Sequence, residues 1–473
     1  MSEPTTDSPP PPPDSFWRSV GQALRGAHHD YTRLTLGRAV LLLSIPMVLE
    51  MIMESLFAVT DVFWVSRLGK EAIAVIGVTE SVMTIIYAIG IGISFAATAI
   101  VARRIGENDP RKAAQAAAQI LMLGLLIASG MGIILAWRAE DILRLMGADE
   151  SVVELGTGYA RLMLGGNVTV FLIFLINAVF RGAGDAVLAM RTLWLANALN
   201  IILDPCFIFG WGPFPELGVT GAAVATNIGR GVGVLYQLWH LTGKPGRVRV
   251  HWADFKPQAA TMMTILKTSG NGIAQLLIAT TSWVVMFKIL APFGSHVLAG
   301  YTIAIRVVMF ALMPAWGLAN AGATLVGQNL GAGKPDRAEA AVRLAARYNV
   351  MFLGLLGLIF IVFAKPLVGI FTTDIMVAAE AVRSLWIISL AFPLYAAGMC
   401  LEATFNGSGD TWTPTRLNFF CLWLGQVPIA WLLADPGGLG PAGVYIAVPV
   451  SFSALTIWSA VLFKRGKWKE KKI

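Results

Sequence analysis

Three acidic residues recur along one apolar segment, residues 39–65, that is long enough to cross a membrane. Glu50, Glu54 and Asp61 stand at positions i, i+4 and i+11. At the rotation of a helix, these side chains point within roughly 40° of one another and form one acidic stripe. A carboxylate inside a bilayer costs about 2.5–3.5 kcal/mol, so acids in spans are candidates for function. This stripe could bind a cation or a proton.

A second polar stripe lies in another apolar segment. Asn197, Asn200 and Asp204 follow one another at helical spacings of three and four residues. Pro205 has no N–H, so the carbonyl of Ile201 loses its usual helical partner beside Asp204. A free carbonyl, a carboxylate and an amide within one turn can form an oxygen cage for a hard cation such as Na⁺. A proton could use the same carboxylates.

Two further residues could add oxygen atoms to such a site: Asn177, late in the fourth predicted span, and Thr226, in the sixth. Single amides and hydroxyls in membranes also join helices by hydrogen bonds, so packing is the alternative for each. For Asp61, and for Glu80 in the second span, the alternative is a solvated position near the membrane interface. Asp204 is flanked by apolar residues on both sides, which favours a buried site.

The other reactive side chains give little support for enzyme chemistry. The five histidines lie in loops or at the ends of predicted spans, so we expect no buried His-based metal site or general base. They are His28, His29, His240, His251 and His296. The three cysteines fall inside predicted spans, which favours core packing over a disulfide or a metal cluster. They are Cys206, Cys400 and Cys421.

The elements that position these side chains follow from composition. Of the 473 residues, 56% are hydrophobic and only 14% charged, and the mean hydropathy is +0.68, which excludes an ordinary soluble protein. Apolar runs of roughly 20 residues or more, enough to cross a bilayer as a helix, recur about twelve times. The predicted spans are 39–65, 72–100, 113–137, 157–180, 188–211, 217–241, 262–291, 297–328, 340–364, 378–404, 413–434 and 440–463. We therefore expect an all-α integral membrane protein with twelve transmembrane helices.

Two motifs repeat at one fixed distance. Val101–Pro110 aligns with Val326–Pro335, and Phe180–Asp185 aligns with Phe405–Asp410. The two offsets are identical, because 326 − 101 = 225 and 405 − 180 = 225. A constant offset indicates a duplicated unit. Since each unit carries an even number of spans, we expect two pseudo-symmetric six-helix lobes in one orientation, a parallel repeat with its axis along the membrane normal.

The repeat divides the chain into five regions. We predict a leader, a first lobe with spans one to six, a linker, a second lobe with spans seven to twelve, and a basic tail. Their boundaries are 1–36, 37–241, 242–261, 262–463 and 464–473. The proline-rich start of the leader is expected to be disordered, and its remainder to lie along the membrane surface as an amphipathic segment.

The basic residues predict the orientation. If the N-terminus is inside, most of the 36 Lys and Arg residues fall in cytoplasmic segments, and only a few, such as Arg67 and Arg138, fall in outer loops. We thus expect a multi-pass protein of the plasma (inner) membrane with both termini cytoplasmic. The net charge of +8 is then a topology signal rather than a sign of nucleic-acid binding, and the tail serves as an anchor.

The second half of the chain lacks most of the acids of the first. Ala279 and Tyr395 stand in apolar surroundings, and two intramembrane residues of this half, Lys288 and Arg306, are cationic. The other intramembrane polar residues are Gln275, Glu402, Asn418 and Gln426. Because the duplication was followed by a loss of acids on one side, we expect ion coupling in the N-terminal lobe.

Four motifs occur together in this chain: Pro46 with Asp61–Gly69, Phe180–Asp185, Asn200–Pro205 and Leu217–Thr226. In these motifs the chain resembles the multidrug and toxic compound extrusion (MATE) transporters, and within them the DinF-type branch. The resemblance covers about residues 37–465. In the NorM-type branch the seventh and tenth spans carry acids, whereas Ala279 and Tyr395 occupy those places here.

The resemblance implies a cation site formed by Asp61 and Asp204 together with Asn177, Asn200 and Thr226. The candidate Na⁺ ligands are Asp61, Asp204, Asn200 and Thr226. Members of the family exchange external Na⁺ or H⁺ for a cytoplasmic substrate, often a cationic drug. We therefore expect a cation-coupled antiporter that exports organic compounds and has no enzyme activity. Its expected partners are the lipid bilayer, the coupling cation and a small organic substrate, with no cofactor, nucleic acid or obligate protein partner.

Three residues are predicted to serve the substrate cavity and one to serve as a hinge. Glu50 and Glu54 would hold a cationic substrate, and Tyr395 would line an apolar wall suited to flat organic cations. Pro46 should loosen the first span while the lobes rock. The alternative is a lipid or lipid-linked glycan flippase, because the family is similar in architecture to such proteins. A flippase needs a basic cavity for phosphate, which only the two cationic residues of the second half support.

Overall fold

The computed structural model describes residues 16–26, 29–243, 246–435 and 438–473. Within these ranges the chain consists of α-helices, short 3-10 turns and one π-helical segment, and contains no strand. The leader is described from Phe16 onward, where α1 (Phe16–Arg25) begins. Its proline-rich start, for which disorder was predicted, lies outside the described residues.

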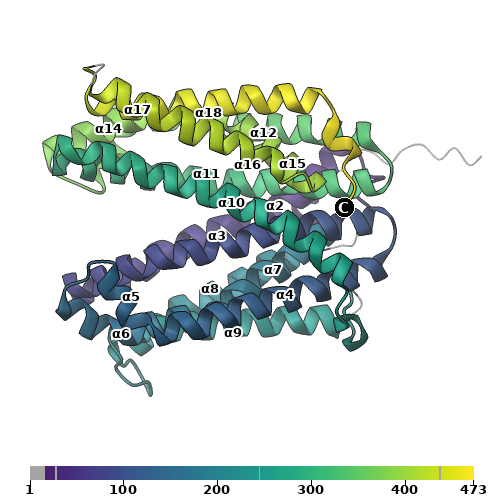
Figure 1. Cartoon of the computed structure of the whole chain (residues 1–473), viewed down its shortest axis with the longest axis horizontal. Helices are drawn as coiled ribbons and strands as arrows, with labels where there is room; N and C mark the ends of the chain where they lie inside the picture. Colours follow the sequence, from purple (N-terminus) through teal and green to yellow (C-terminus); the bar gives the residue numbers. More distant parts are fainter. Residues whose placement is uncertain (1–15, 27–28, 244–245, 436–437) are drawn as a thin grey trace, which may run out of the picture.

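The first half of the chain forms one lobe, drawn below the other in Figure 1. Its spans are α2 (Leu36–Val65), α3 (Lys70–Gly106), α4 (Pro110–Trp137), the pair α6 (Glu150–Gly165) and α7 (Asn167–Ala183), α8 (Ala186–Phe209) and α9 (Val219–Thr242). The short helix α5 (Ala139–Leu145) joins α4 to α6. The fourth span is thus assembled from two consecutive helices.

The second half forms the other lobe in the same order. Its spans are α10 (Ala259–Leu290), α11 (Ser295–Gly331), α12 (Pro335–Val362), the pair α14 (Ile375–Ser389) and α15 (Phe392–Ser408), the run of α16 (Trp412–Asn418), a π-helix (Phe419–Gln426) and α17 (Val427–Ala434), and finally α18 (Pro441–Lys464). The short helix α13 (Ala364–Gly369) precedes α14. A 3-10 turn (Lys467–Glu470) follows α18.

The predicted spans are confirmed. Ten helical segments are long and apolar enough to cross a membrane, and the pair α14 and α15, bent by 57°, adds an eleventh. α9, at the sixth predicted span, is not among these segments. It packs against α8 in the same bundle and carries the polar residues Asn227, Arg230 and Gln237. Each of the twelve predicted ranges coincides with one helix, one helix pair or one helical run.

Equivalent turns of the two lobes have the same backbone geometry. Gly184 and Gly409, which end α7 and α15, both have φ 87°. Gly69 and Gly294, which precede α3 and α11, have φ 108° and 107°. These left-handed conformations favour glycine over any residue with a side chain. Both pairs stand at the offset of the motifs (409 − 184 = 225 and 294 − 69 = 225), so the sequence repeat is a structural repeat.

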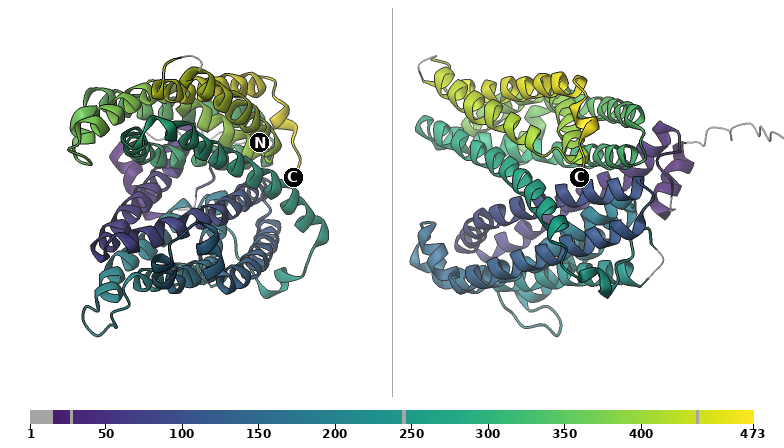
Figure 2. Two further views of the ribbon diagram at one scale, coloured as in Figure 1. Left: turned by 60° about the vertical axis from the view of Figure 1, so that its left-hand side comes forward. Right: turned by 45° about the vertical axis from the view of Figure 1, so that its right-hand side comes forward.

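The lobes meet through a reciprocal contact between α3 and α11. A Cβ atom on Gly106 would lie 2.0 Å from the carbonyl oxygen of Gln328, and a Cβ on Gly331 would lie 2.1 Å from the carbonyl oxygen of Arg103. The repeat relates the two contacts, because 331 − 106 = 225 and 328 − 103 = 225. We call the end of the molecule that carries Gly106, Gly331 and the C-terminus the terminal face. Figure 2 shows the lobes converging toward it.

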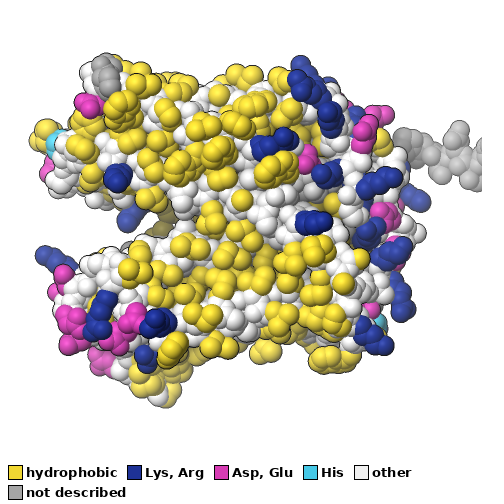
Figure 3. All heavy atoms as spheres, viewed as in Figure 1, with side chains coloured by type: hydrophobic (Ala, Val, Ile, Leu, Met, Phe, Trp, Pro, Cys, Tyr) yellow, Lys and Arg dark blue, Asp and Glu magenta, His cyan; other side chains and the backbone are white. Residues whose placement is uncertain are grey.

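The lobes separate toward the opposite end, which carries Gly69 and Gly294 and which we call the open face. Figure 3 shows a cleft between the two lobes at this end. Figure 3 also shows that much of the surface between the two ends is apolar, whereas many Lys and Arg side chains gather at the terminal face. This distribution suits a protein whose middle is surrounded by lipid.

The C-terminal tail is docked on the terminal face. Trp468 is 1% exposed and stacks on Phe463. Arg103 donates a 2.7 Å hydrogen bond to the carbonyl of Lys471, and Lys469 pairs with Glu339 of α12. The tail therefore contacts helices of both lobes, beyond the anchor role that its charge alone predicts.

Candidate functional site

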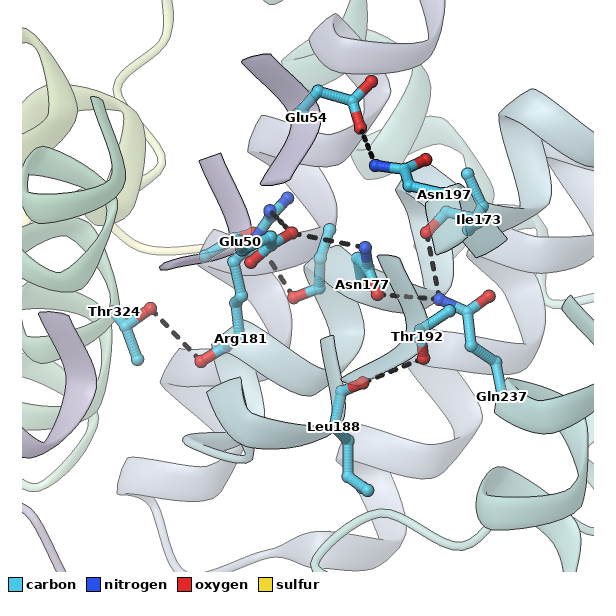
Figure 4. A network of polar contacts seen from close by, with 12 residues as sticks. Glu50, Glu54, Ile173, Asn177, Arg181, Leu188, Thr192, Asn197, Gln237 and Thr324 are labelled. Carbon is cyan, nitrogen blue, oxygen red and sulfur yellow. Dashed lines mark hydrogen bonds and ion pairs between the residues drawn. The ribbon is translucent and has the colours of Figure 1, made fainter. Parts of the chain in front are cut away.

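The acidic stripe of α2 faces the interior of the N-terminal lobe. Figure 4 shows Glu50 and Glu54 turned toward side chains of the helices around Asn177 and Asn197. Glu50 is 1% exposed, whereas Glu54 and Asp61 are half-buried. The predicted stripe is therefore real, and its members differ in their access to solvent.

Glu50 belongs to a buried polar network, in which its second carboxylate oxygen has no hydrogen-bond partner within the described residues. Its carboxylate accepts from Arg181 at 2.9 Å, as an ion pair, and from the amide of Asn177 at 3.3 Å. Gln237 in turn donates to the side-chain oxygen of Asn177 at 2.7 Å, and Thr324 of the other lobe donates to the backbone carbonyl of Arg181 at 3.2 Å. Figure 4 shows this network. In this conformation, the carboxylate predicted to hold a cationic substrate is buried and already neutralised.

Glu54 lies one helical turn further toward the open face. Asn197 of α8 donates to its carboxylate at 3.0 Å (Figure 4). No Lys or Arg of the described chain forms an ion pair with Glu54. Glu54 is half-buried and lacks the ion pair that Glu50 has, although Arg230 of α9 lies within electrostatic range of it. Its role in a substrate cavity stays a prediction.

Asp204, Asn200 and Thr226 form the predicted oxygen-rich group. Asp204 is 0% exposed. The amide nitrogen of Asn200 donates to an oxygen of Asp204 at 3.1 Å and to the hydroxyl of Thr226 at 3.0 Å. The second carboxylate oxygen of Asp204 and the side-chain oxygen of Asn200 have no hydrogen-bond partner within the described residues. The carboxylate of Asp204 can thus accept a proton, and both buried oxygens can contact a small cation.

Asp61 stands within electrostatic range of Asp204 and of Glu80. The two aspartates of the predicted cation site therefore interact with each other, and the positive charge of Arg230 on α9 is also within electrostatic range of Asp61. Asn177, which the family resemblance adds to this site, hydrogen-bonds to Glu50 instead. Asn177 lies at the level of Glu50, and eleven residues, or about 16 Å of helix, separate Glu50 from Asp61 along α2. Asn177 is therefore too far from Asp61 to join it. The structure thus divides the predicted residues into two groups.

Arg230 of α9 is a charged residue of this region that the sequence interpretation missed. Its guanidinium lies 5.8 Å from the ring centre of Phe57 and 6.0 Å from that of Tyr87, and it donates to the Tyr87 hydroxyl at 3.5 Å. Glu54 and Glu80 are within electrostatic range of it. The sequence did contain a signal for Arg230, because an arginine inside a membrane span is energetically costly and therefore rare.

Arg181 and Gln237 were missed for a different reason. Arg181 was predicted to lie just beyond a span, in a loop, which is wrong. It lies in the last turn of α7, and its long side chain brings the charge to Glu50. Gln237 lies near the end of α9, where its contact with Asn177 depends on how α7 and α9 pack. Neither contact can be read from spacing along one helix.

The remaining predicted residues are placed as follows. Tyr395 is half-buried on α15, with its ring against Phe452 at 4.5 Å. Pro46 is buried inside α2, which continues through it as one helix. Lys288 and Arg306 are exposed. The described residues contain no group of three or more His, Cys, Asp or Glu side chains that could hold a metal ion, so any cation on α8 would depend on amide, hydroxyl and single carboxylate oxygens.

Comparison with known proteins agrees with this architecture. The MatE family profile matches residues 46–206 and again residues 272–432, so the starts of its two matches are separated by nearly the repeat offset (272 − 46 = 226). The chain is 27% identical over 442 residues to a probable multidrug resistance protein NorM of Thermotoga maritima, covering 91% of this chain and 93% of the relative. It is 26% identical over 435 residues to a FAD transporter of Shewanella oneidensis, covering 89% and 93%.

A solved structure, described as the outward-facing conformation of a multidrug resistance MATE family transporter of the MOP superfamily, superimposes with a TM-score of 0.86. It is 27% identical, and the alignment covers 92% of this chain and 98% of that one. The family profile spans more than half of the chain. The chain therefore belongs to the MatE family of multidrug and toxic compound extrusion transporters, as a multi-pass membrane transporter and not an enzyme.

Proposed function

We propose that this chain is a cation-coupled antiporter that exports organic, mostly cationic, compounds from the cytoplasm by alternating access. Relatives named as multidrug resistance proteins support this class of substrate. The acidic region of the N-terminal lobe supports coupling to H⁺ or Na⁺. The coupling ion and the substrate would compete for that region.

The distribution of charge supports an orientation. Lys and Arg side chains gather at the terminal face (Figure 3). Short loops on the cytoplasmic side of membrane proteins carry an excess of Lys and Arg. We therefore place the terminal face, with both termini, in the cytoplasm of a cell whose plasma (inner) membrane holds the protein. The cleft at the open face would then open to the outside.

The observation that carries the proposal is the unpartnered oxygen of the fully buried Asp204. A carboxylate removed from water without a counter-ion is costly, so such a site favours a proton or a small cation. Asp61 adds a second negative charge within electrostatic range. An ion that neutralises this pair lowers the attraction for a cationic substrate, and entry of the ion from outside would thus release the substrate into the cleft.

Movement of the lobes would complete the cycle. The reciprocal backbone contacts at Gly106 and Gly331 close the terminal face and must separate to open it. The carbonyl of Met47, directly after Pro46, is approached by Gly317 of α11 so closely that an added Cβ would lie 2.6 Å away. Because Pro46 removes one backbone hydrogen bond from α2 next to this contact, α2 can change shape there while Asp61 responds to the ion.

Replacement of Asp204 by Asn tests the proposal. The variant keeps the shape of the side chain and removes its charge, so we expect ion-dependent drug efflux to fall by about tenfold or more, which corresponds to about 1.4 kcal/mol. Export would be measured as drug resistance of cells and as ion-driven efflux. Glu154→Gln, which removes an exposed carboxylate of α6, is the control. Full resistance and unchanged ion-dependent efflux in the Asp204→Asn variant would refute the proposal.

A second candidate substrate class is an aromatic anion. Arg230 offers a positive charge between the rings of Phe57 and Tyr87, a setting that suits a planar group carrying a negative charge. One relative is named a FAD transporter. Competition by riboflavin phosphates against efflux of a cationic dye separates the two classes, because inhibition at micromolar concentration supports the anion and no inhibition supports the cation.

A further inference from the structure

Two segments outside the spans run between the lobes at the terminal face. The leader strap, residues 29–35, precedes α2, and the tail strap, residues 467–473, follows α18. Each strap lies against a glycine that ends a helix of one lobe, Gly184 for the leader strap and Gly409 for the tail strap. Because 409 − 184 = 225, the repeat relates these two glycines. The straps are thus placed by the same symmetry as the lobes.

The leader strap is attached to the N-terminal lobe through Tyr31. Tyr31 is 4% exposed, its hydroxyl donates to the carbonyl of Gly184 at 3.1 Å, and a Cβ atom on Gly184 would lie 2.7 Å from its ring. Arg247 joins the strap to the end of α7, since it donates to the carbonyl of Ala183 at 3.0 Å and to that of His29. These contacts fix the strap beside α7.

The same strap is also attached to the C-terminal lobe. Arg337 of α12 donates to the backbone carbonyl of Tyr31 at 3.2 Å and to that of Leu34. Lys334, which precedes α12, donates to the carbonyl of Thr32 at 3.0 Å. The leader strap therefore lies between the lobes and is bound to both.

The tail strap shows this arrangement with the lobes exchanged. Ile473 lies against Gly409 of the C-terminal lobe, where an added Cβ would be 2.5 Å from the Ile473 side chain. From the N-terminal lobe, Arg103 donates to the carbonyl of Lys471 at 2.7 Å. Arg104 donates to the carbonyl of Ile473 at 2.7 Å, and the Ile473 side chain packs on the apolar core of the N-terminal lobe. The tail strap is thus bound to both lobes as well.

The cationic donors that bind the straps come from equivalent parts of the repeat. The two arginines of α3 belong to the motif Val101–Pro110, and Lys334 belongs to the equivalent motif Val326–Pro335. Hydrogen bonds from charged donors are stronger than those between neutral groups. Because each strap is attached to both lobes, the lobes cannot separate at the terminal face until each strap has lost one of its attachments.

We propose that the two straps are a pair of latches that hold the terminal face closed, so that their release controls the opening of the transporter to the cytoplasm. The proposal rests on the proposed alternating access, in which this face opens once in every cycle. It gives the tail a role in transport besides that of an anchor. Since the two latches share no partner, their contributions to the closure should add.

Labelling of a buried cysteine measures this closure. Gln328 is 1% exposed and donates to the carbonyl of Gly182 in the other lobe at 3.0 Å, so a cysteine in its place reacts only when the terminal face opens. Gln328→Cys is introduced into the full chain, with the three native cysteines replaced by alanine, and studied in lipid nanodiscs without an ion gradient or a substrate. The rate of reaction with a charged maleimide is then proportional to the open fraction.

One variant releases each strap. Arg337→Gln removes a charged donor from the leader strap, and Ile473→Lys places a charge in the apolar contact of the tail strap, next to two arginines. We expect each variant to raise the labelling rate about tenfold, and the two together about a hundredfold. Arg347→Gln, at an exposed arginine of α12, and Lys472→Ala, at the exposed neighbour of Ile473, are the matched controls and should label at the wild-type rate.

A milder variant guards against misfolding. Tyr31→Phe keeps the buried ring and removes only the hydroxyl that donates to Gly184, so we expect labelling to rise about fivefold. Unchanged labelling in both Tyr31→Phe and Arg337→Gln would remove the leader strap from the closure. A rise in only one of the two strap variants would overturn the pairing of the latches.

Gly331→Ala separates the failure of this proposal from the failure of alternating access, because it disturbs the contact between the lobes and leaves both straps intact. If Gly331→Ala labels faster than wild type while neither strap variant does, the face opens and the straps are not latches. If none of these variants labels faster, the latches and the opening of this face both fail. The assay contains no coupling ion gradient, so a failure of coupling at Asp204 leaves its result unchanged.

Discussion

Arg181 and Glu50 lie on α7 and α2, yet their charged groups are 2.9 Å apart and Glu50 is 1% exposed. Thr324 of the second lobe donates to the backbone carbonyl of the same arginine. This arrangement places a neutralised ion pair where the two lobes touch. Among the acids of the first span, Glu50 is therefore already paired, whereas Glu54 and Asp61 remain available to an ion or a substrate.

The ion pair should stabilise the fold only while both partners are present. Glu50→Gln leaves the charge of Arg181 buried and alone, so we expect the free energy of unfolding to fall by about 3–5 kcal/mol. Arg181→Gln should have a similar effect, and the double variant should recover most of the loss, because no uncompensated charge remains. Thermal unfolding of the four proteins in detergent forms the double-mutant cycle. Additive losses would mean that the two charges do not stabilise each other.

The glycine contacts should control the closure of the terminal face. In Gly331→Ala, the new Cβ would lie 2.1 Å from the carbonyl oxygen of Arg103, which is backbone and cannot turn away. We expect this variant to populate states with a separated terminal face, measured as labelling by a thiol reagent of a cysteine introduced there. Gly130→Ala is the matched control, because nothing lies within 4 Å of its added Cβ. Equal labelling in the two variants would show that the contact does not hold the lobes together.

The docked tail should add to this closure. Deleting residues 467–473 removes the buried Trp468 and the ion pair between Lys469 and Glu339. We expect the shortened protein to melt several degrees lower, since burial of such a side chain is worth about 2–3 kcal/mol. It should also label more readily at the terminal face. Lys472→Ala, a change at an exposed position of the tail, should leave both measurements at their wild-type values.

Arg230 should set the charge preference of the substrate. Glu54 and Glu80 lie within electrostatic range of Arg230, so the arginine partly neutralises these two carboxylates. Their attraction for a cationic substrate is therefore weaker than it would be without Arg230. We expect Arg230→Gln to bind a fluorescent organic cation about tenfold more tightly, and Arg230→Lys to resemble wild type. Fluorescence anisotropy on the purified proteins gives the dissociation constants. Weaker binding of the cation to Arg230→Gln would indicate instead that the arginine contacts the substrate directly.

The spans and the lobes could be predicted because their signals are local or periodic. Apolar length marks each helix, and the constant offset between the repeated motifs marks the duplication. The proximity of Asn200 and Asp204 could be predicted for the same reason, because the two residues lie one turn apart on one helix. Thr226 joins them because α8 packs on α9, and the spacing of polar residues could only suggest this third member.

What could not be predicted depends on which helices touch. Asn177 of α7 contacts Glu50 through its side chain although α2 packs mainly against α8 and α11, and no pattern along either helix reveals this contact. Arg181 lies in the last turn of α7 and not in the loop that was predicted, and from there its side chain reaches a buried acid. Arg230 is different, because its charge inside a predicted span was visible in the sequence and was overlooked.

The central claim is that a cation exchanged at Asp61 and Asp204 drives export. Its most direct test is uptake of a fluorescent organic cation into inverted membrane vesicles, energised separately by a Na⁺ gradient and by a pH gradient. We predict that one or both gradients drive uptake by the wild-type protein and that neither drives it in Asp61→Asn or Asp204→Asn. Gradient-driven uptake at the wild-type rate in both variants would contradict the account.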